Sequence, residues 1–261
     1  NFLAWPFAPR GSEMLSVRTL AVLPGPQELA EAVGDALFAR LRILIEEAEP
    51  GQRVNLAISG GAITSSLLPS LRGRVGEVDW SRVRVWFVDE RYVAAGDPDR
   101  NDDQAWQGFF HAAPGVEFIR MPSQAPGGRG DDSLDAAALA FEDTWTSLMG
   151  DGSFDIALIG MGPDGHIASL FPGRIDDEAR PILAVRDSPK PPPERITVSM
   201  PLMRRCAEVW LATSGAAKAR AIGEAFAGAS PQRVPVAGVL TPTTRVYLDA
   251  AAAADIDVSH A

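Results

Sequence analysis

A histidine and an aspartate lie two residues apart in a glycine-rich segment of this chain, FDIALIGMGPDGHIASLFPG at residues 154–173. The imidazole of His166 titrates near neutral pH and is the commonest general base in enzymes, and Asp164 is close enough in sequence to orient it. A loop histidine can also simply cap the next turn. We favour an acid/base pair, because the segment continues a predicted strand, and ligands of α/β proteins bind at the carboxyl ends of strands.

The glycines of this segment suggest a competing function. Gly160, Gly162 and Gly165 have the GxGxxG spacing of a dinucleotide-binding loop, and Asp187 lies roughly 20 residues further on, as that motif requires. However, the carboxylate of Asp164 would repel a pyrophosphate, and a proline follows too soon for a long helix. We therefore expect no NAD or FAD and assign no cofactor.

A second set of residues could hold an anionic group. Ser59, Gly60 and Gly61 end a predicted strand and precede a helix start, where glycines let the backbone approach a phosphate and free N–H groups face it. Arg91 ends the next strand and Lys218 begins a later helix, so both could contact phosphate oxygens. The alternatives are an ordinary tight turn, a salt bridge from Arg91 to its acidic neighbours, and a solvated surface lysine.

Two further charged residues accompany this set. Asp89 lies at the end of the same predicted strand as Arg91, and Arg195 follows the proline-rich segment SPKPPPE. Arg195 has the same two explanations as Arg91, which are an anion contact and a structural salt bridge.

The predicted elements place these residues at one edge of a sheet. Helical spacing of apolar residues predicts helices at 27–51, 134–150 and 215–228, and a weaker one from Thr64. Strands are predicted at 53–59, 82–90, 154–160, 194–200, 207–214 and 244–250. Because strands and helices alternate, we predict a single α/β domain of Rossmann-like type, with a mostly parallel sheet, helices on both faces and room for a small extra lobe. This domain spans 14–261, and we expect residues 1–13 to be a disordered or non-native tail.

The composition excludes several classes of protein. The net charge of −10 argues against nucleic acid and anionic membranes as partners, and no apolar run approaches the ~20 residues of a membrane helix. Cys206 is the only cysteine, so no intramolecular disulfide forms, and the three histidines lack metal-ligand spacing. We expect a cytoplasmic monomer or weak homodimer without a bound metal.

With these residues identified, the sequence resembles the 6-phosphogluconolactonases, the lactone-hydrolysing enzymes of the pentose phosphate pathway. The resemblance extends over about residues 20–250, and its segments occur in the order typical of the family. They are LAISGG, VWFVDERYV, FDIALIGMGPDGHIASLFPG, PKPPPERITVSMPLM and VWLATSGAAKARAI.

The resemblance implies hydrolysis of 6-phospho-D-glucono-1,5-lactone to 6-phospho-D-gluconate, on a fold shared with glucosamine-6-phosphate deaminases. It implies that His166 is the catalytic base with Asp164 beside it. It also implies that Ser59-Gly60-Gly61, Arg91 and Lys218 form the phosphate site. The remaining predicted substrate contacts are Asp89, Gly162 and Arg195.

Two segments depart from the family pattern. The family commonly continues SGG with Ser-Thr-Pro, whereas Ala62-Ile63-Thr64 follows here, so a threonine hydroxyl expected on the phosphate is displaced or missing. The family often has Ser-Asn after the DER segment, where this chain has Arg100-Asn101. Both departures concern details of substrate contact.

Two other functions remain as alternatives. An amino-sugar-phosphate isomerase/deaminase would use the same phosphate cradle, with an acid such as Asp89 taking a proton from the substrate. The segment ASLFPG after the histidine lacks the added acidic residue that such an enzyme would have there. A non-catalytic sugar-phosphate sensor would carry a DNA-binding module, which the acidic charge disfavours.

Overall fold

A computed structural model of the chain describes residues 19–124, 131–175 and 180–256. The strands are β1 (Thr19–Leu23), β2 (Val54–Ile58), β3 (Val83–Phe87), β4 (Asp89–Arg91), β5 (Glu117–Phe118), β6 (Ile156–Ile159), β7 (Ile182–Val185), β8 (Arg195–Val198), β9 (Glu208–Thr213) and β10 (Arg245–Asp249). The α-helices are α1 (Pro26–Glu47), α2 (Leu68–Ser70), α3 (Asn101–Gly108), α4 (Asp131–Met149), α5 (Met200–Arg205) and α6 (Ala219–Phe226). Residues 1–13, expected to precede the domain, lie outside the described residues, so that boundary stays a prediction.

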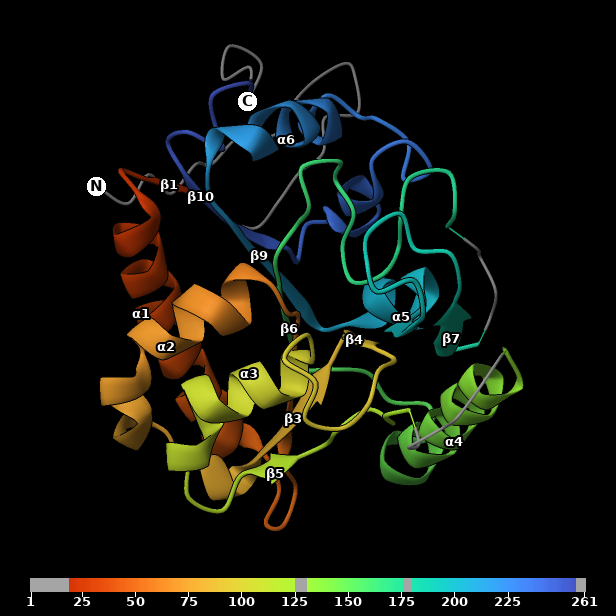
Figure 1. Cartoon of the computed structure of the whole chain (residues 1–261). Helices are drawn as coiled ribbons and strands as arrows, with labels where there is room; N and C mark the ends of the chain where they lie inside the picture. Colours follow the sequence, from red (N-terminus) through yellow and green to blue (C-terminus); the bar gives the residue numbers. More distant parts are fainter. Residues whose placement is uncertain (1–18, 125–130, 176–179, 257–261) are drawn as a thin grey trace.

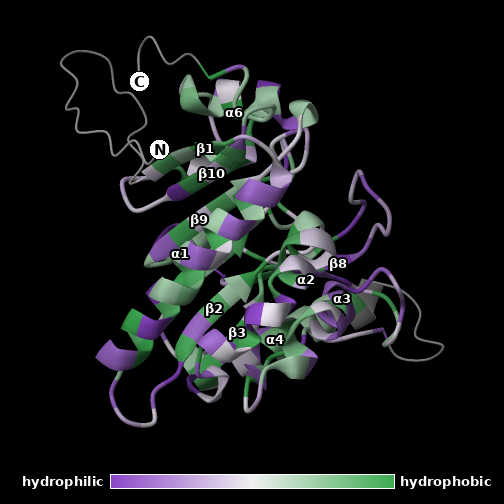
Figure 2. Cartoon of the chain, turned by 90° about the vertical axis from the view of Figure 1, so that its left-hand side faces the viewer, coloured by the Kyte–Doolittle hydropathy of each residue, from purple (hydrophilic) through white to green (hydrophobic). Residues whose placement is uncertain are grey.

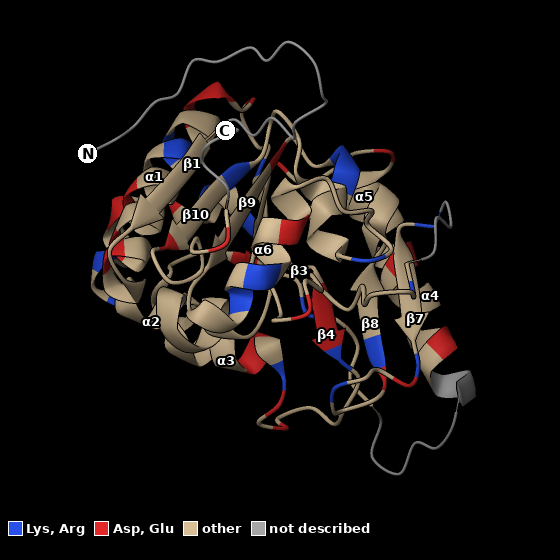
Figure 3. Ribbon diagram, turned by 90° about the horizontal axis from the view of Figure 1, so that it is seen from above, with Lys and Arg blue, Asp and Glu red and all other residues tan. Residues whose placement is uncertain are grey.

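The main sheet has seven strands in the order β1-β10-β9-β6-β2-β3-β5, and its paired neighbours run parallel. Helices α1 and α4 lie on opposite sides of it (Figure 1; Figure 3). Polar and apolar residues alternate along α1 (Figure 2), which buries Val33, Leu37 and Leu41. On α4, the ring of Trp145 packs edge-on against Trp86 of β3, with 5.3 Å between centroids. This architecture confirms the predicted parallel sheet with helices on both faces.

The order of the strands reverses between β2 and β6. From β2 the chain builds β3 and β5 on one side, and it later places β6, β9 and β10 on the other. Ile58 at the end of β2 is in register with Phe87 of β3 and Leu158 of β6, so these strands end at the same edge. The loops that follow β2 and β6 therefore diverge around a crevice, the usual ligand position in such sheets.

A second sheet corrects the predicted strand assignments. The segment 82–90, predicted as one strand, is divided into β3 and β4. The segment 194–200 forms β8, which pairs antiparallel with β4 and with β7 instead of joining the parallel sheet. Val88 explains the division, because its N–H donates to Ile58 in the main sheet while its carbonyl accepts from Val198 of β8. This small sheet lies beside α4 (Figure 3) and carries Asp89, Arg91 and Arg195.

The remaining elements are short. The weak helix predicted from Thr64 is a π-helical turn over Ile63–Leu67, followed by α2. Within the described ranges, no helix is both long and apolar enough to cross a membrane.

Candidate active site

The crevice between β2 and β6 opens into a cavity of about 270 Å³. The loops after β2, β6 and β9 line it, together with residues of β4 and β8. The predicted site residues among its lining are Ser59, Gly60, Gly61, Asp89, Arg91, Gly162, His166, Arg195 and Lys218. Asp164 is not part of the lining but contacts His166. The structure thus brings the predicted residues together, while their chemical roles stay predictions.

His166 and Asp164 form a hydrogen-bonded pair. Nδ1 of His166 lies 2.5 Å from Oδ1 of Asp164, which favours the tautomer with its proton on Nδ1 and a lone pair on Nε2. Burial lowers the pKa of His166, the Asp164 carboxylate opposes that effect, and Lys190 adds to it. Although burial raises the pKa of Asp164, its contacts with His166 and Lys190 hold that pKa below the usual value. Near neutral pH the pair therefore presents a neutral imidazole backed by an ionised carboxylate.

Glycines shape the loop around this pair. A Cβ on Gly162 would lie 2.0 Å from both Cε1 and Nδ1 of His166, so the imidazole packs directly on the glycine backbone. Gly165 has a φ of +81°, which favours glycine, and its N–H donates to the Gly162 carbonyl. No helix follows β6 within residues 160–175, all of which are described. The glycine pattern thus makes room for the histidine, and the long helix of a dinucleotide-binding loop does not follow it.

Behind the histidine stands a wall of polar and aromatic groups. The rings of His166 and Phe171 lie 4.8 Å apart between centroids. Ser169 Oγ donates to Oδ2 of Asp89 at 2.7 Å, and Nη1 of Arg195 lies 3.9 Å from the same oxygen. The Arg195 guanidinium also lies over the Phe171 ring, 5.9 Å from its centroid. The Asp89 carboxylate therefore has two partners in this wall, the Ser169 hydroxyl and the Arg195 guanidinium.

The loop after β2 is fixed by its own backbone and by the loop after β6. Ser59 Oγ accepts the N–H of Gly160 at 2.8 Å and so ties the two loops together across the crevice. Gly61 has a φ of +64°, again favourable for glycine. The Thr64 hydroxyl is buried, 3.2 Å from the Gly61 carbonyl and 3.1 Å from Oε1 of Gln104. Thr64 lies outside the cavity lining, and the effect of this departure on phosphate contact stays a prediction.

Four cations line this cavity of a protein with a net charge of −10, namely Arg91, Lys190, Arg195 and Lys218. The Arg91 guanidinium donates to the carbonyl of Asp99, and among the described residues its Nε has no hydrogen-bond partner. Lys218 Nζ donates to the carbonyl of Met161 at 2.6 Å. The other two cations approach carboxylates, Lys190 at 3.5 Å from Asp164 and Arg195 at 3.9 Å from Asp89. Because carbonyls carry no full charge, Arg91 and Lys218 keep their positive charge available to an anion.

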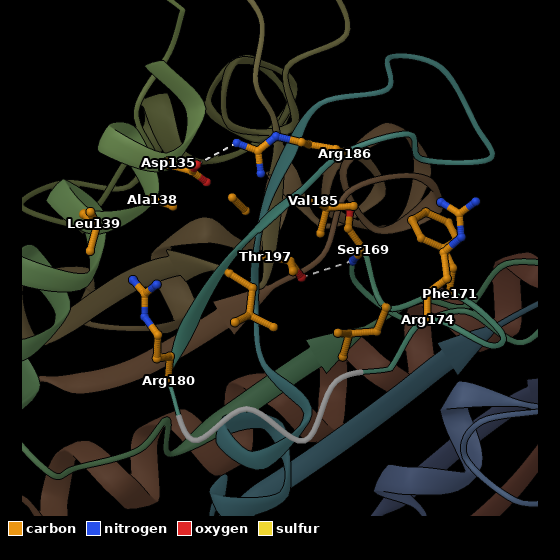
Figure 4. Close-up of a pocket in the computed structure, with 13 residues that line it drawn as sticks. Asp135, Ala138, Leu139, Ser169, Phe171, Arg174, Arg180, Val185, Arg186 and Thr197 are labelled. Atoms are coloured by element: carbon orange, nitrogen blue, oxygen red, sulfur yellow. Dashed lines mark hydrogen bonds and ion pairs between the residues drawn. The ribbon is translucent and has the colours of Figure 1, made fainter. Parts of the chain in front are cut away.

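A larger cavity, of about 540 Å³, lies behind the segment 169–171. Its lining comes mainly from α4, β7 and the segment 169–171 itself, with Thr197 of β8 (Figure 4). Arg186 pairs there with Asp135 at 2.7 Å, and Arg180 pairs with Glu142 at 2.7 Å. Since none of the predicted site residues lines it, its size alone does not make it the candidate active site.

Known proteins similar to this chain identify its family. The model of the family described as glucosamine-6-phosphate isomerases/6-phosphogluconolactonase matches residues 24–248. A Mycobacterium leprae protein named 6-phosphogluconolactonase is 39% identical over 237 residues, covering 88% of this chain and 92% of its own. A protein of the same name from Streptomyces coelicolor is 34% identical over 238 residues, covering 87% and 91%. This chain belongs to the glucosamine-6-phosphate isomerase/6-phosphogluconolactonase family.

Solved structures agree with this family assignment at the level of the fold. The structure of 6-phosphogluconolactonase from Trypanosoma brucei matches with a TM-score of 0.80 at 21% identity, covering 94% of this chain and 100% of that chain. The 6-phosphogluconolactonase from Leishmania guyanensis matches with a TM-score of 0.76 at 22% identity, covering 90% and 97%. At these identities the likeness shows the fold alone.

Sequence reasoning did not select Lys190, a cation in the lining of this cavity. Lys190 Nζ lies 3.3 Å from Nδ1 of His166 and 3.5 Å from Oδ1 of Asp164. Arg195 shapes the segment that presents it, because Nη2 of Arg195 donates to the carbonyls of Lys190 and Pro191. The signal was present, since Lys190 stands in the PKPPPER segment that carries the family resemblance.

Cys206, the only cysteine of the sequence, is buried. Burial raises the pKa of its thiol to about 12, which leaves almost no thiolate at neutral pH. In the part of the chain that the structure describes, no cluster of three or more His, Cys, Asp or Glu side chains could hold a metal ion.

Proposed function

We propose that this protein hydrolyses 6-phospho-D-glucono-1,5-lactone to 6-phospho-D-gluconate. The observation that carries the proposal is the His166–Asp164 pair, joined at 2.5 Å, at a cavity lined by cations. A base beside an anion site suits a neutral ester that carries a remote phosphate. The names of the relatives at 34–39% identity support the same reaction.

His166 acts as the general base. Its Nε2 takes a proton from water while the water oxygen forms a bond to C1 of the lactone, and the carbonyl electrons move onto the carbonyl oxygen. Asp164 holds the Nδ1 proton and stabilises the imidazolium that forms. When the tetrahedral intermediate collapses, the bond from C1 to the ring oxygen breaks and the imidazolium returns its proton to that oxygen. The products are a carboxylic acid, which ionises, and a free hydroxyl group.

The state of the histidine suits this step. Burial keeps the pKa of His166 below its ordinary value, so the base is unprotonated at neutral pH. Asp164 works in the opposite direction and limits the loss of basicity. A lactone is already an activated ester, so base catalysis worth ~10²–10⁴-fold is a sufficient contribution.

The phosphate binds at the other side of the cavity. Gly60 and Gly61 supply backbone N–H groups, and Arg91 and Lys218 supply charge. Anchoring the phosphate places C1 beside His166 and removes the entropy of alignment from the chemical step. Asp89, Gly162 and Arg195 complete the lining around the sugar ring.

The first experiment follows the decay of freshly generated 6-phosphogluconolactone with and without the protein, in the presence of EDTA. We expect faster decay with formation of 6-phosphogluconate, since the proposed chemistry needs neither a metal nor a cofactor. A rate equal to the spontaneous one, with folded protein, contradicts the proposal. Release of ammonia from glucosamine 6-phosphate would then point to the isomerase branch of the family.

We further propose that the protein acts in the cytoplasm as a monomer or weak homodimer on a phosphorylated sugar lactone. The acidic net charge supports a small-molecule substrate rather than nucleic acid or an anionic membrane surface. Sedimentation at micromolar concentration measures the assembly state directly.

A further inference from the structure

Glu90 lies between two residues of the cavity lining, yet its own side chain is turned into the protein and only 1% exposed. Its Oε1 accepts the backbone N–H groups of Arg91 and Asn101, each at 2.8 Å. Its Oε2 accepts the N–H of Asp102, also at 2.8 Å. Asn101 and Asp102 begin α3, and Arg100 before them supplies no side-chain cap. The Glu90 carboxylate on β4 therefore caps a helix that begins eleven residues later in the chain.

The start of α3 in turn contacts the proposed phosphate cradle. Asn101 lines the cavity, and its Nδ2 donates to the carbonyl of Asp89 at 3.1 Å. Its side chain also packs on Gly60, because a Cβ on that glycine would lie 1.9 Å from Oδ1 of Asn101. Glu90 thus connects Arg91 on one wall with Asn101 and Gly60 on the other.

Keeping this carboxylate ionised is costly. Burial and the nearby Asp102 carboxylate raise the pKa of Glu90 to about 7, although Arg100 and the backbone N–H groups oppose them. Arg195 on β8 is a further charge that faces Glu90. Since the folded pKa lies above the unfolded one, the stabilising effect of the neutral form is lost as pH rises through about 7. Stability therefore does not explain why a charged group stands here.

We propose that Glu90 is a positioning residue for phosphate binding. Its carboxylate holds Arg91 of β4 and Asn101 of α3 at a fixed separation, so that Arg91 and the Gly60–Gly61 loop meet the same phosphate. The inference rests on the proposed function, because it names the group that aligns the phosphate site of that reaction. Glu90 itself touches neither the substrate nor His166.

The test compares Glu90→Gln with a matched control, Glu208→Gln. Glu208 is also buried, 4% exposed, but it begins β9 at the end remote from the cavity. It accepts hydrogen bonds from Trp210, Arg40 and Arg245, which hold its pKa below the usual value although burial raises it. The lowered pKa of Glu208 thus favours its ionised form in the folded protein, whereas the raised pKa of Glu90 favours its neutral form.

We expect Glu90→Gln to raise both KM for the lactone and Kd for inorganic phosphate by about tenfold, with kcat within about threefold of wild type. Its Tm should stay above that of Glu208→Gln. The control should lose Tm while its KM and its phosphate Kd stay at wild-type values. Asn101→Ala cuts the connection at its other end and should raise KM and Kd in the same way, even if Glu90→Gln fails to fold.

Three outcomes would overturn the inference. One is a KM and phosphate Kd within twofold of wild type in Glu90→Gln, or in Asn101→Ala where Glu90→Gln does not fold. Another is a loss of activity that only follows a loss of folded protein. The third is a wild-type protein that binds no inorganic phosphate. Failure of the proposed function is distinguishable, because a wild-type protein without lactonase activity can still show the phosphate difference between wild type and Glu90→Gln.

Discussion

The larger and the smaller cavity share a wall but differ in how most of their cations are compensated. In the larger cavity, Arg186 and Arg180 each pair with a carboxylate at 2.7 Å, and Arg174 donates to the carbonyl of Asp187. In the smaller one, Arg91 and Lys218 donate to backbone carbonyls, which leaves their positive charge for a ligand. The larger cavity has about twice the volume of the smaller, so volume does not distinguish the site. What distinguishes the site is positive charge that is available to a ligand and lies next to a base.

The largest effect that this comparison predicts is at the base. His166→Asn should lower kcat by ~10²–10⁴-fold while Kd for inorganic phosphate stays near the wild-type value, because the phosphate cations are untouched. Steady-state kinetics and a phosphate titration measure the two quantities separately. A kcat within tenfold of wild type would remove His166 from the proposed role.

A methyl group beneath the histidine should have the next largest effect. Gly162→Ala places a Cβ where the His166 ring now lies and must displace the ring, so kcat should fall by about 10²-fold. Gly73→Ala is the control, since a Cβ there meets no atom within 4 Å. Equal activity of the two variants would show that the position of His166 is not critical.

A moderate effect is expected at Lys190, where a charge lies beside the base. Lys190 lowers the pKa of His166, so Lys190→Met should raise it. Because the base must be neutral, the acidic limb of the kcat/KM profile should then move to higher pH, with activity recovered at alkaline pH. Lys190→Arg keeps the charge and should leave the limb in place. An unmoved limb in Lys190→Met would mean that the lysine does not tune the histidine.

The smallest effect is expected in the larger cavity. Arg186→Gln breaks a partly exposed ion pair with Asp135 and should cost less than ~1 kcal/mol of stability. Its kcat/KM for the lactone should stay within about twofold of wild type, since no step of the reaction uses this cavity. A tenfold loss of activity with normal Tm would show instead that the shared wall couples the two cavities.

The sequence predicts that the site residues meet at one edge of the parallel sheet, but it does not predict the small antiparallel sheet. The parallel strands are apolar runs ending in glycine or polar residues, so both the strands and the edge where they end can be recognised. The pattern of 194–200 is equally strand-like, but apolar patterning does not reveal which sheet a strand joins. Only the two-sided backbone pairing of Val88 decides that.

The missed residues depend on contacts distant in sequence. In the sequence, Lys190 looks like a surface lysine in a proline-rich segment. It belongs to the site only because it contacts His166, which lies 24 residues earlier in the chain. Helix α3 lacks both an apolar stripe and a local cap, so no sequence rule detects its start. The carboxylate that caps it belongs to Glu90, whereas the sequence predicted only the neighbouring Asp89 and Arg91 as site residues.

That distant cap also has a consequence for the order of folding. An isolated helix as short as α3 is marginal in water, and its first N–H groups find their acceptor only once β4 is in place. We therefore expect residues 101–108 to become helical only after β4 is in place, and a peptide of this segment alone should be unstructured. One side of the proposed phosphate site is thus completed late in folding, on a sheet that already exists.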